Sequence, residues 1–286
     1  MTFRFLGTGT SVGVPQIGCT CKTCTSSDPR DKRRRCGAYV TGSDGSAFIV
    51  DTPPELRLAC LEYGIDKVDA VVLTHAHMDH AAGFDDVRRF NTLNGTKVPC
   101  EPGDPLYRGL PYRIVGKPMT CYAMPETIDQ MHRIFPYISA EGGKNGLYRP
   151  MIEFDPSPSF SLGSVAVERL AVEHGFPCCG YLFGERAAGG GVSAGGAVAY
   201  ISDCCALPDE TIERISGVAV LVIDCLRERP HPTHLSLAQA KECIGRISPS
   251  RAYLTHLCHD FTHAEWLEKL RGTGIEPAFD GLELEV

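Results

Sequence analysis

A short segment of the chain concentrates side chains that bind metal ions. It reads Thr74-His75-Ala76-His77-Met78-Asp79-His80 and directly follows the apolar run 68–73. A β-branched apolar run that ends in imidazoles and a carboxylate is typical of a buried strand leading into a ligand loop. Imidazole nitrogens and carboxylate oxygens suit borderline cations such as Zn²⁺, so His75 and His77 are expected to share one metal. We expect Asp79 and His80 to face a second metal close by.

Later segments repeat the pattern of a strand followed by a candidate ligand. His174 stands where a strand-like segment meets a loop, and Asp203 and Asp224 each follow an apolar run. The last strand-like segment runs into His256 and His259. Only one of the two aspartates is needed as a ligand.

A second cluster combines three cysteines in the spacing C-x-C-x₂-C, at Cys19, Cys21 and Cys24. A closed structural zinc site takes four ligands, so this spacing predicts a fourth Cys or His from elsewhere in the chain. Cys36 is the nearest candidate and His259 is the other. The remaining cysteines are expected to stay thiols, because nothing in the sequence indicates export to an oxidising compartment.

Composition places the chain among soluble globular proteins. It has 286 residues, of which 43% are hydrophobic and 22% charged, and one large domain over 1–286 is the expected organisation. The net charge of −7 argues against a general nucleic-acid surface, yet fits a small anionic substrate held by metals. Neither a signal peptide nor an apolar stretch of about 20 residues is evident, so we expect a cytoplasmic protein without a membrane partner.

The elements around these residues alternate between strands and helices. Strands are expected at 3–6, 38–40, 47–50, 119–123, 165–170, 180–183, 197–201, 218–223 and 252–254. Helices are expected at 56–63, 81–90, 125–135, 237–247 and 263–270, with Ser236 and Thr262 as N-caps of the last two.

Two segments depart from this alternation. Residues 94–118 form an insertion in which Pro99, Pro102, Pro105 and Pro111 are expected to break any regular element. This insertion is compatible with a surface loop that has no function, with a lid and with a homodimer contact. Residues 187–196 are rich in glycine and are expected to form the flexible tip of a hairpin.

The ordered ligand set resembles the metallo-β-lactamase superfamily across essentially the whole chain. That resemblance implies an α/β protein built as a four-layer αββα sandwich, with a binuclear site at one edge of its sheets. It implies a first metal held by His75, His77 and His174. It implies a second metal held by Asp79, His80 and His256, with Asp203 bridging the two.

Further motifs narrow the resemblance to the PhnP-like family of phosphodiesterases. They are Phe5-Leu6-Gly7-Thr8-Gly9-Thr10-Ser11, the cysteine trio, Asp85-Asp86-Val87-Arg88 and Leu254-Thr255-His256-Leu257-Cys258-His259. The resemblance implies hydrolysis of a small phosphodiester, such as a ribosyl 1,2-cyclic phosphate or a nucleotide, by a hydroxide bridging two zinc or manganese ions. It also implies one structural zinc, with His259 as the fourth ligand. Besides Asp79, the expected catalytic residue is His234, as general acid, with His231 as the alternative.

Two other hydrolase classes remain open from the sequence. A nuclease that processes tRNA 3′ ends, like tRNase Z, shares the catalytic ligands, but it lacks the cysteine site and the acidic net charge disfavours it. A thioester or lactam hydrolase of the same superfamily would keep the metals. A non-catalytic binding module would require broken ligands, whereas the set is complete.

Overall fold

The computed structural model describes residues 1–101, 103, 109–138, 150–186 and 191–286. Within these residues the chain forms two large sheets of seven strands each. The first runs in the order β16 (Glu283–Glu285), β1 (Thr2–Gly7), β2 (Gly37–Thr41), β3 (Ala47–Val50), β4 (Ala70–Val72), β7 (Met119–Tyr122), β8 (Ile152–Asp155). The second runs β15 (Ile275–Pro277), β14 (Arg251–Thr255), β13 (Val220–Asp224), β12 (Ala197–Ile201), β11 (Cys179–Glu185), β10 (Val165–Ala171), β9 (Ser159–Leu162).

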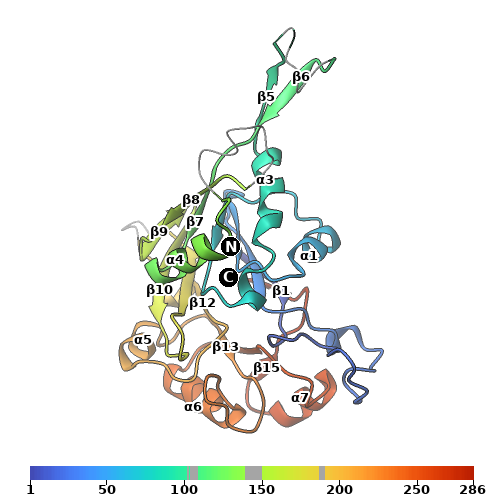
Figure 1. Ribbon diagram of the computed structural model, residues 1–286. Coiled ribbons are helices and arrows are strands. Elements are labelled where there is room, and N and C mark those ends of the chain that lie inside the picture. Colours follow the sequence, from blue (N-terminus) through green and yellow to red (C-terminus); the bar gives the residue numbers. More distant parts are fainter. Residues whose placement is uncertain (102, 104–108, 139–149, 187–190) are drawn as a thin grey trace.

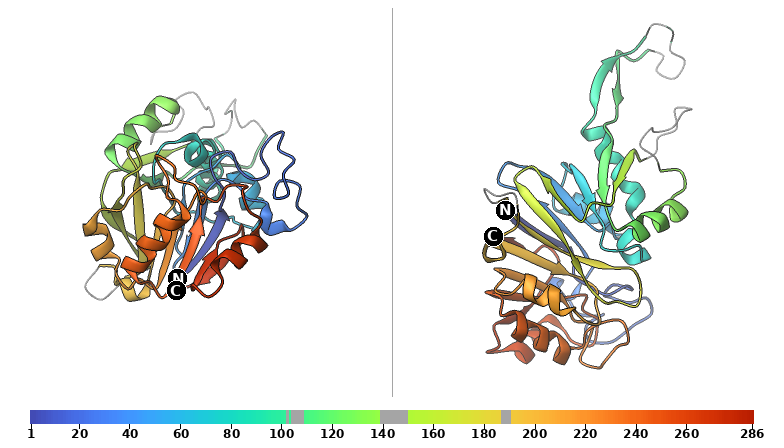
Figure 2. Two further views of the ribbon diagram at one scale, coloured as in Figure 1. Left: turned by 90° about the horizontal axis from the view of Figure 1, so that it is seen from below. Right: turned by 90° about the vertical axis from the view of Figure 1, so that its left-hand side faces the viewer.

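Helices cover the outer face of each sheet (Figures 1 and 2). Next to the first sheet lie α1 (Leu56–Glu62), α2 (Met78–Ala81), α3 (Arg88–Leu93) and α4 (Pro125–Ile134). Next to the second lie α5 (Asp209–Arg214), α6 (Leu237–Ile247) and α7 (His263–Leu270). Each helical layer shares a buried apolar cluster with its sheet. The four-layer αββα sandwich expected from the sequence is therefore confirmed.

A third apolar cluster fills the space between the two sheets. Alternation along β1 turns Phe3 and Phe5 to this inner face, because successive side chains of a strand point to opposite sides. The rings of Phe48 and Phe183, from opposite sheets, have centroids 5.4 Å apart. This packing fixes one sheet against the other, and thereby fixes the loops that leave their edges.

Helices α6 and α7 begin directly after the capping residues that were predicted from the sequence. Ser236 accepts a hydrogen bond from the backbone N–H of Gln239, and Thr262 accepts one from that of Glu265. In both cases the third helical residue bonds back to the cap, which completes a capping box. The predicted ranges 237–247 and 263–270 are confirmed.

The expectation of one helix over 81–90 is wrong. The chain instead forms α2, a 3₁₀ turn at Phe84–Val87 and then α3. The interruption lies at Gly83, whose N–H donates to the Thr52 carbonyl at 2.8 Å rather than to a carbonyl of its own helix. A Cβ at position 83 would lie 2.3 Å from the Pro53 carbonyl oxygen. This close approach of two distant segments stops the helix.

The expectation that prolines exclude regular structure from the insertion is also wrong. Strands β5 (Thr96–Pro99) and β6 (Tyr112–Val115) pair in antiparallel register and stand away from the rest of the molecule (Figures 1 and 2). Pro99 is tolerated because it closes the end of a two-stranded ladder, where both strands are edges. Of the four prolines expected to break structure, those at 102 and 105 lie outside the described residues.

The predicted flexible tip at 187–196 lies partly outside the described residues, which resume at 191. Its last residues form a short 3₁₀ turn, Ala194–Gly196, that leads into β12. Among the described helices, none has the length and apolar character needed to cross a bilayer.

Candidate metal centre

The predicted ligands of the first metal lie together. His75 and His77 follow β4, while His174 follows β10 of the opposite sheet. Nε2 of His75 lies 2.9 Å from Nδ1 of His77, and Nε2 of His174 lies 3.5 Å from the same atom. Ligand atoms of all three fall within 4.8 Å of one another. Loops from the two sheets thus converge on one point at the rim of the sandwich.

The predicted ligands of the second metal lie directly beside the first group. Asp79, His80 and His256 form another set within 4.8 Å. The two oxygens of Asp203 lie between them: Oδ2 is 3.1 Å from His80 Nε2, and Oδ1 is 3.3 Å from His256 Nε2. Asp203 also belongs to a set with His75 and His80. Its carboxylate therefore adjoins both groups, as a bridging ligand must.

The donor set fits two divalent cations. Among the described residues, His80 Nε2, His256 Nε2 and Asp203 Oδ2 are buried without a hydrogen-bond partner, which costs about 1–3 kcal/mol for each such group. Imidazole and carboxylate atoms that converge on one space and lack other partners suit a zinc-like ion. Burial lowers the pKa of His75 and of His174, which favours the neutral imidazole that binds metal.

The carboxylate that orients this group was not among the residues predicted from the sequence. Asp51 directly follows β3, and its Oδ2 lies 2.8 Å from Nδ1 of His80. The backbone N–H of Thr74 donates to Asp51 Oδ1 at 2.8 Å, so the same side chain also fixes the start of the ligand loop. A carboxylate on the far nitrogen of a ligand histidine aims the ring and raises its basicity. The available signal was a carboxylate at a strand end, as at Asp203.

Replacing Asp51 by asparagine is expected to weaken active-site metal binding by about 10–100-fold while the fold persists. The amide keeps the size of the side chain but removes the charge that faces the His80 ring. Equilibrium metal titration of the stripped protein, followed by metal analysis, measures the change. Asp66→Asn, at an exposed position, is the matched control. Equal metal affinities for Asp51→Asn and the native protein would contradict this role.

The two candidate general acids differ in their placement. The ring of His234 lies 4.5 Å from that of His256 and 4.9 Å from that of His174. Its Nδ1 is 2.9 Å from Oδ2 of buried Asp224, a second carboxylate whose role the sequence left undecided. His231 lies farther out, against His234 and Thr233. The structure therefore brings His234, rather than His231, against the predicted ligands.

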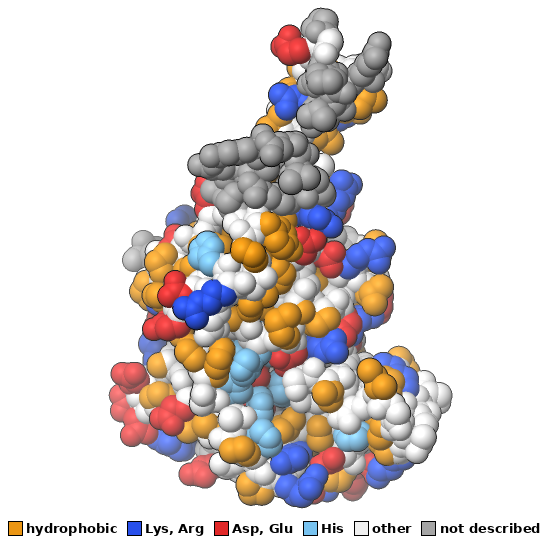
Figure 3. Space-filling view, viewed as in Figure 1, with side chains coloured by type: hydrophobic (Ala, Val, Ile, Leu, Met, Phe, Trp, Pro, Cys, Tyr) orange, Lys and Arg blue, Asp and Glu red, His pale blue; other side chains and the backbone are white. Residues whose placement is uncertain are grey.

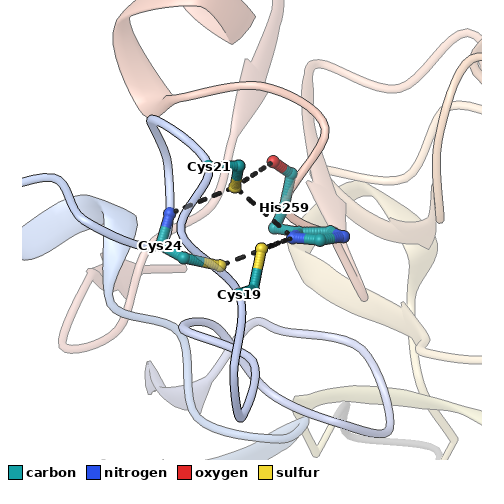
Figure 4. Close-up of side chains that lie close together, drawn as sticks. All are labelled: Cys19, Cys21, Cys24 and His259. Carbon is teal, nitrogen blue, oxygen red and sulfur yellow. Dashed lines mark hydrogen bonds between the residues drawn. The ribbon is translucent and has the colours of Figure 1, made fainter.

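The cysteine trio meets His259, and Figure 4 shows the four side chains converging. Nδ1 of His259 lies 3.3, 3.5 and 3.4 Å from the sulfurs of Cys19, Cys21 and Cys24. A tetrahedral site with Zn–S bonds of about 2.3 Å and Zn–N bonds of about 2.0 Å separates sulfur from nitrogen by about 3.5 Å. The cluster therefore has the dimensions of a structural zinc site.

The local backbone assists this site. The N–H of Cys24 donates to the sulfur of Cys21 and helps lower the pKa of that thiol to about 6, which favours the thiolate that binds zinc. Cys36, the other candidate for the fourth ligand, points elsewhere: its sulfur contacts the Gly9 carbonyl and the Thr255 hydroxyl. The structure brings only His259 of the two candidates to the trio.

The histidine cluster opens to the surface. Figure 3 shows pale blue histidine side chains gathered on one part of the surface, with hydrophobic side chains above them. His77 and Asp79 are partly exposed, whereas His75 and His80 are buried. A substrate can therefore reach the exposed side of the cluster while the buried side holds the ligands in place.

Residues 47–257 match the family described as the beta-lactamase superfamily domain. The chain is 32% identical over 284 residues to an octanoyltransferase of Porphyromonas gingivalis. The aligned region covers 97% of this chain but only 50% of that relative. A crystal structure described as a new diphosphatase from the PhnP family has a TM-score of 0.79 and 33% identity, covering 100% of this chain and 97% of the other. Zinc-bound PqqB from Methylobacterium extorquens, at TM-score 0.73 and 17% identity, covers 100% of both chains and shares the fold.

Proposed function

Since this chain belongs to the β-lactamase superfamily and is PhnP-like within it, we propose that it is a binuclear metal-dependent phosphodiesterase. The proposed substrate is a small phosphodiester, such as a ribosyl 1,2-cyclic phosphate or a nucleotide. The observation that carries this proposal is the Asp224–His234 pair against a complete set of metal ligands. Such a pair is suited to protonating a poor leaving group, and an alkoxide released from a phosphodiester needs that proton.

The proposed ligands are those that the sequence indicated: His75, His77, Asp79, His80, His174, Asp203 and His256. When bound, two divalent cations lower the pKa of a bound water toward about 7 and withdraw charge from a phosphoryl oxygen. The chain itself supplies their positions, since the loops that carry these residues follow strands of both sheets. It also supplies buried carboxylates and imidazoles, whose charges and dipoles are in place before a substrate binds.

His234 has the geometry of a proton donor. Its Nδ1 faces Asp224, so an N–H at that atom is held by the carboxylate and fixes the orientation of the ring. The other nitrogen, Nε2, is then left to give a proton to the leaving oxygen. The neighbouring rings of His174 and His256 place this nitrogen beside the ligand cluster.

A panel of three substrates tests the proposed function. Metal-stripped protein, reconstituted with Mn²⁺ or Zn²⁺, is assayed with a ribose cyclic phosphate, a 2′,3′-cyclic nucleotide and a tRNA precursor. We expect metal-dependent cleavage of at least one small cyclic phosphate and none of the RNA. Cleavage of the RNA alone would identify a nuclease instead. Inactivity on all three, with turnover of a thioester, would overturn the phosphodiesterase proposal.

The thioester outcome is included because of the octanoyltransferase similarity. That relative carries a name for acyl transfer, but this chain spans only half of its length. The name therefore does not assign acyl chemistry to the half that matches. The PhnP-family structure matches this chain over its whole length at a similar identity.

Replacing His234 by glutamine is expected to lower kcat by about 10²–10⁴ for an alkyl leaving group. With p-nitrophenolate, which leaves without a proton, the loss should be below about tenfold. Parallel assays of a ribose cyclic phosphate and bis(p-nitrophenyl) phosphate measure the difference, and His231→Gln is the control. Equal losses on both substrates would exclude His234 as the proton donor.

A further inference from the structure

Helix α4 presents three side chains to a hollow beside the candidate metal centre. Gln130, Arg133 and Ile134 lie on one face of the helix, because residues three and four apart are neighbours on its surface. Thr127 and Met131 of the same helix are buried, and Met131 belongs to the apolar cluster against which Ile134 also packs. The hollow has a volume of about 390 Å³ and is lined by Ala76, His77, Met78, Gln130, Arg133, Ile134 and Phe176. It shares His77 with the proposed ligand set.

The floor of this hollow is aromatic and aliphatic. The ring of Phe176 stacks on that of His77 at a centroid distance of 4.3 Å and an interplanar angle of 27°. Met78 is 53% exposed although its neighbours His75 and His80 are buried. An exposed methionine next to a half-buried aromatic ring offers an adaptable apolar contact surface at the entrance to the site.

Among the residues that the structure describes, no partner binds the two polar groups on this face of α4. Within the described part of the chain, neither the guanidinium of Arg133 nor the amide of Gln130 has a hydrogen-bond or ion-pair partner. Other arginines in the chain are bound to carboxylates, for example Arg214 to Glu168 and Arg30 to Asp28. Of the described residues that line the hollow, Arg133 is also the only Lys or Arg. Its charge is therefore available to a ligand.

We propose that this hollow is a subsite for the part of the substrate that stays on phosphorus, and that this part is a nucleoside carrying a second phosphate. The proposal rests on the proposed phosphodiesterase function and adds the class of substrate. The apolar floor would pack against the planar base, and the Gln130 amide would form hydrogen bonds with its polar edge. The guanidinium of Arg133 would bind the second phosphate.

The position of the hollow assigns it to the retained group rather than to the leaving group. His234, the proposed proton donor, contacts His174 and His256, whereas Phe176 contacts His75 and His77. The proton donor and the hollow thus adjoin different members of the cluster. A leaving oxygen near His234 leaves the other substituent on the side of α4.

Two matched substrates test the subsite. Thymidine 5′-(p-nitrophenyl phosphate) and its 3′-phosphorylated counterpart both yield p-nitrophenol when water cleaves the ester bond, and they differ only in the second phosphate. For the native metal-loaded protein we expect the 3′-phosphate to lower KM by about tenfold, in keeping with one charge-assisted contact. In Arg133→Gln this advantage should vanish, with kcat unchanged, and Arg133→Lys should recover part of it.

The controls separate this proposal from the proposed function. Arg271→Gln, which alters an exposed arginine paired with Glu268, should keep the full advantage. Hydrolysis of methyl p-nitrophenyl phosphate, which lacks base and second phosphate, should be equal in the native protein and Arg133→Gln. Failure of that reaction in the native protein would count against the phosphodiesterase function and not against the subsite.

Binding supplies a readout that does not depend on turnover. Calorimetry with thymidine 3′,5′-bisphosphate and thymidine 5′-monophosphate should give tighter binding of the bisphosphate, and Arg133→Gln should abolish the difference. Equal affinities in the native protein, or a difference that survives Arg133→Gln, would overturn the subsite. The outcome of this titration therefore decides the proposal even if the p-nitrophenyl esters are not cleaved.

Discussion

Replacing Asp203 by alanine is expected to reduce turnover by more than about 100-fold and to release most of the active-site metal. Asp203 is the residue that adjoins both proposed metal positions, and losing even an outer partner of a ligand commonly costs 10–100-fold. Although burial opposes its ionisation, His256 and His80 hold the pKa of the Asp203 carboxyl well below its usual range. The side chain is therefore ionised and ready to bind metal at neutral pH.

Metal analysis after dialysis, circular dichroism and a phosphodiesterase assay together measure this outcome. The fold should survive, because Asp203 lies in a loop after β12 rather than in one of the three apolar clusters. Asp209→Ala, at an exposed position on α5, is the control and should retain metal and activity. Full turnover with retained metal in Asp203→Ala would contradict the ligand assignment.

Replacing Cys24 by serine is expected to remove the structural zinc and to lower the thermal midpoint by roughly 10 °C or more. Zinc binding contributes about 10–16 kcal/mol in zinc-finger peptides, and a loss of only a few kcal/mol shifts the midpoint of a domain this large by about that amount. The proposed site ties the loop of Cys19, Cys21 and Cys24 to His259, far away in the sequence. The exposed Lys22–Glu265 ion pair, which joins the cysteine loop to α7, is too weak to replace the metal.

The same substitution should also lower activity, because His256 lies on the loop that carries His259 and follows β14. Zinc content, the thermal midpoint and turnover are measured in parallel on Cys24→Ser. Cys243→Ser, on α6 and away from both clusters, is the matched control and should resemble the native protein. A Cys24→Ser protein with unchanged zinc content and midpoint would show that the four residues do not form a structural site.

The sequence predicted most strands, the last two helices and the candidate ligands because each of these leaves a local mark, whereas the four-layer sandwich was implied by the family resemblance. Strands that end in histidine or aspartate reveal where ligands leave a sheet, and Ser236 and Thr262 mark helix starts by the hydrogen bonds that such residues make locally. These signals depend only on neighbours in the chain. They can therefore be recognised without knowing which segments pack against them.

What the sequence could not show depends on contacts between distant segments. The helix expected over 81–90 is interrupted because Gly83 meets Pro53 across the fold. Asp51 follows a predicted strand, and only the structure places it against His80. The Asp224–His234 pair likewise joins a strand end to a later loop. Each of these is a tertiary contact with no local pattern.

The measurement that tests the central claim most directly is a metal titration of phosphodiester hydrolysis. Protein stripped of its active-site metal, with the structural zinc retained, is titrated with Mn²⁺ or Zn²⁺ in the presence of bis(p-nitrophenyl) phosphate. The proposed binuclear site predicts no turnover before addition and activity that saturates at two added equivalents, with Asp203→Ala inactive throughout. Turnover without added metal, or no turnover at any metal concentration, would contradict a binuclear phosphodiesterase.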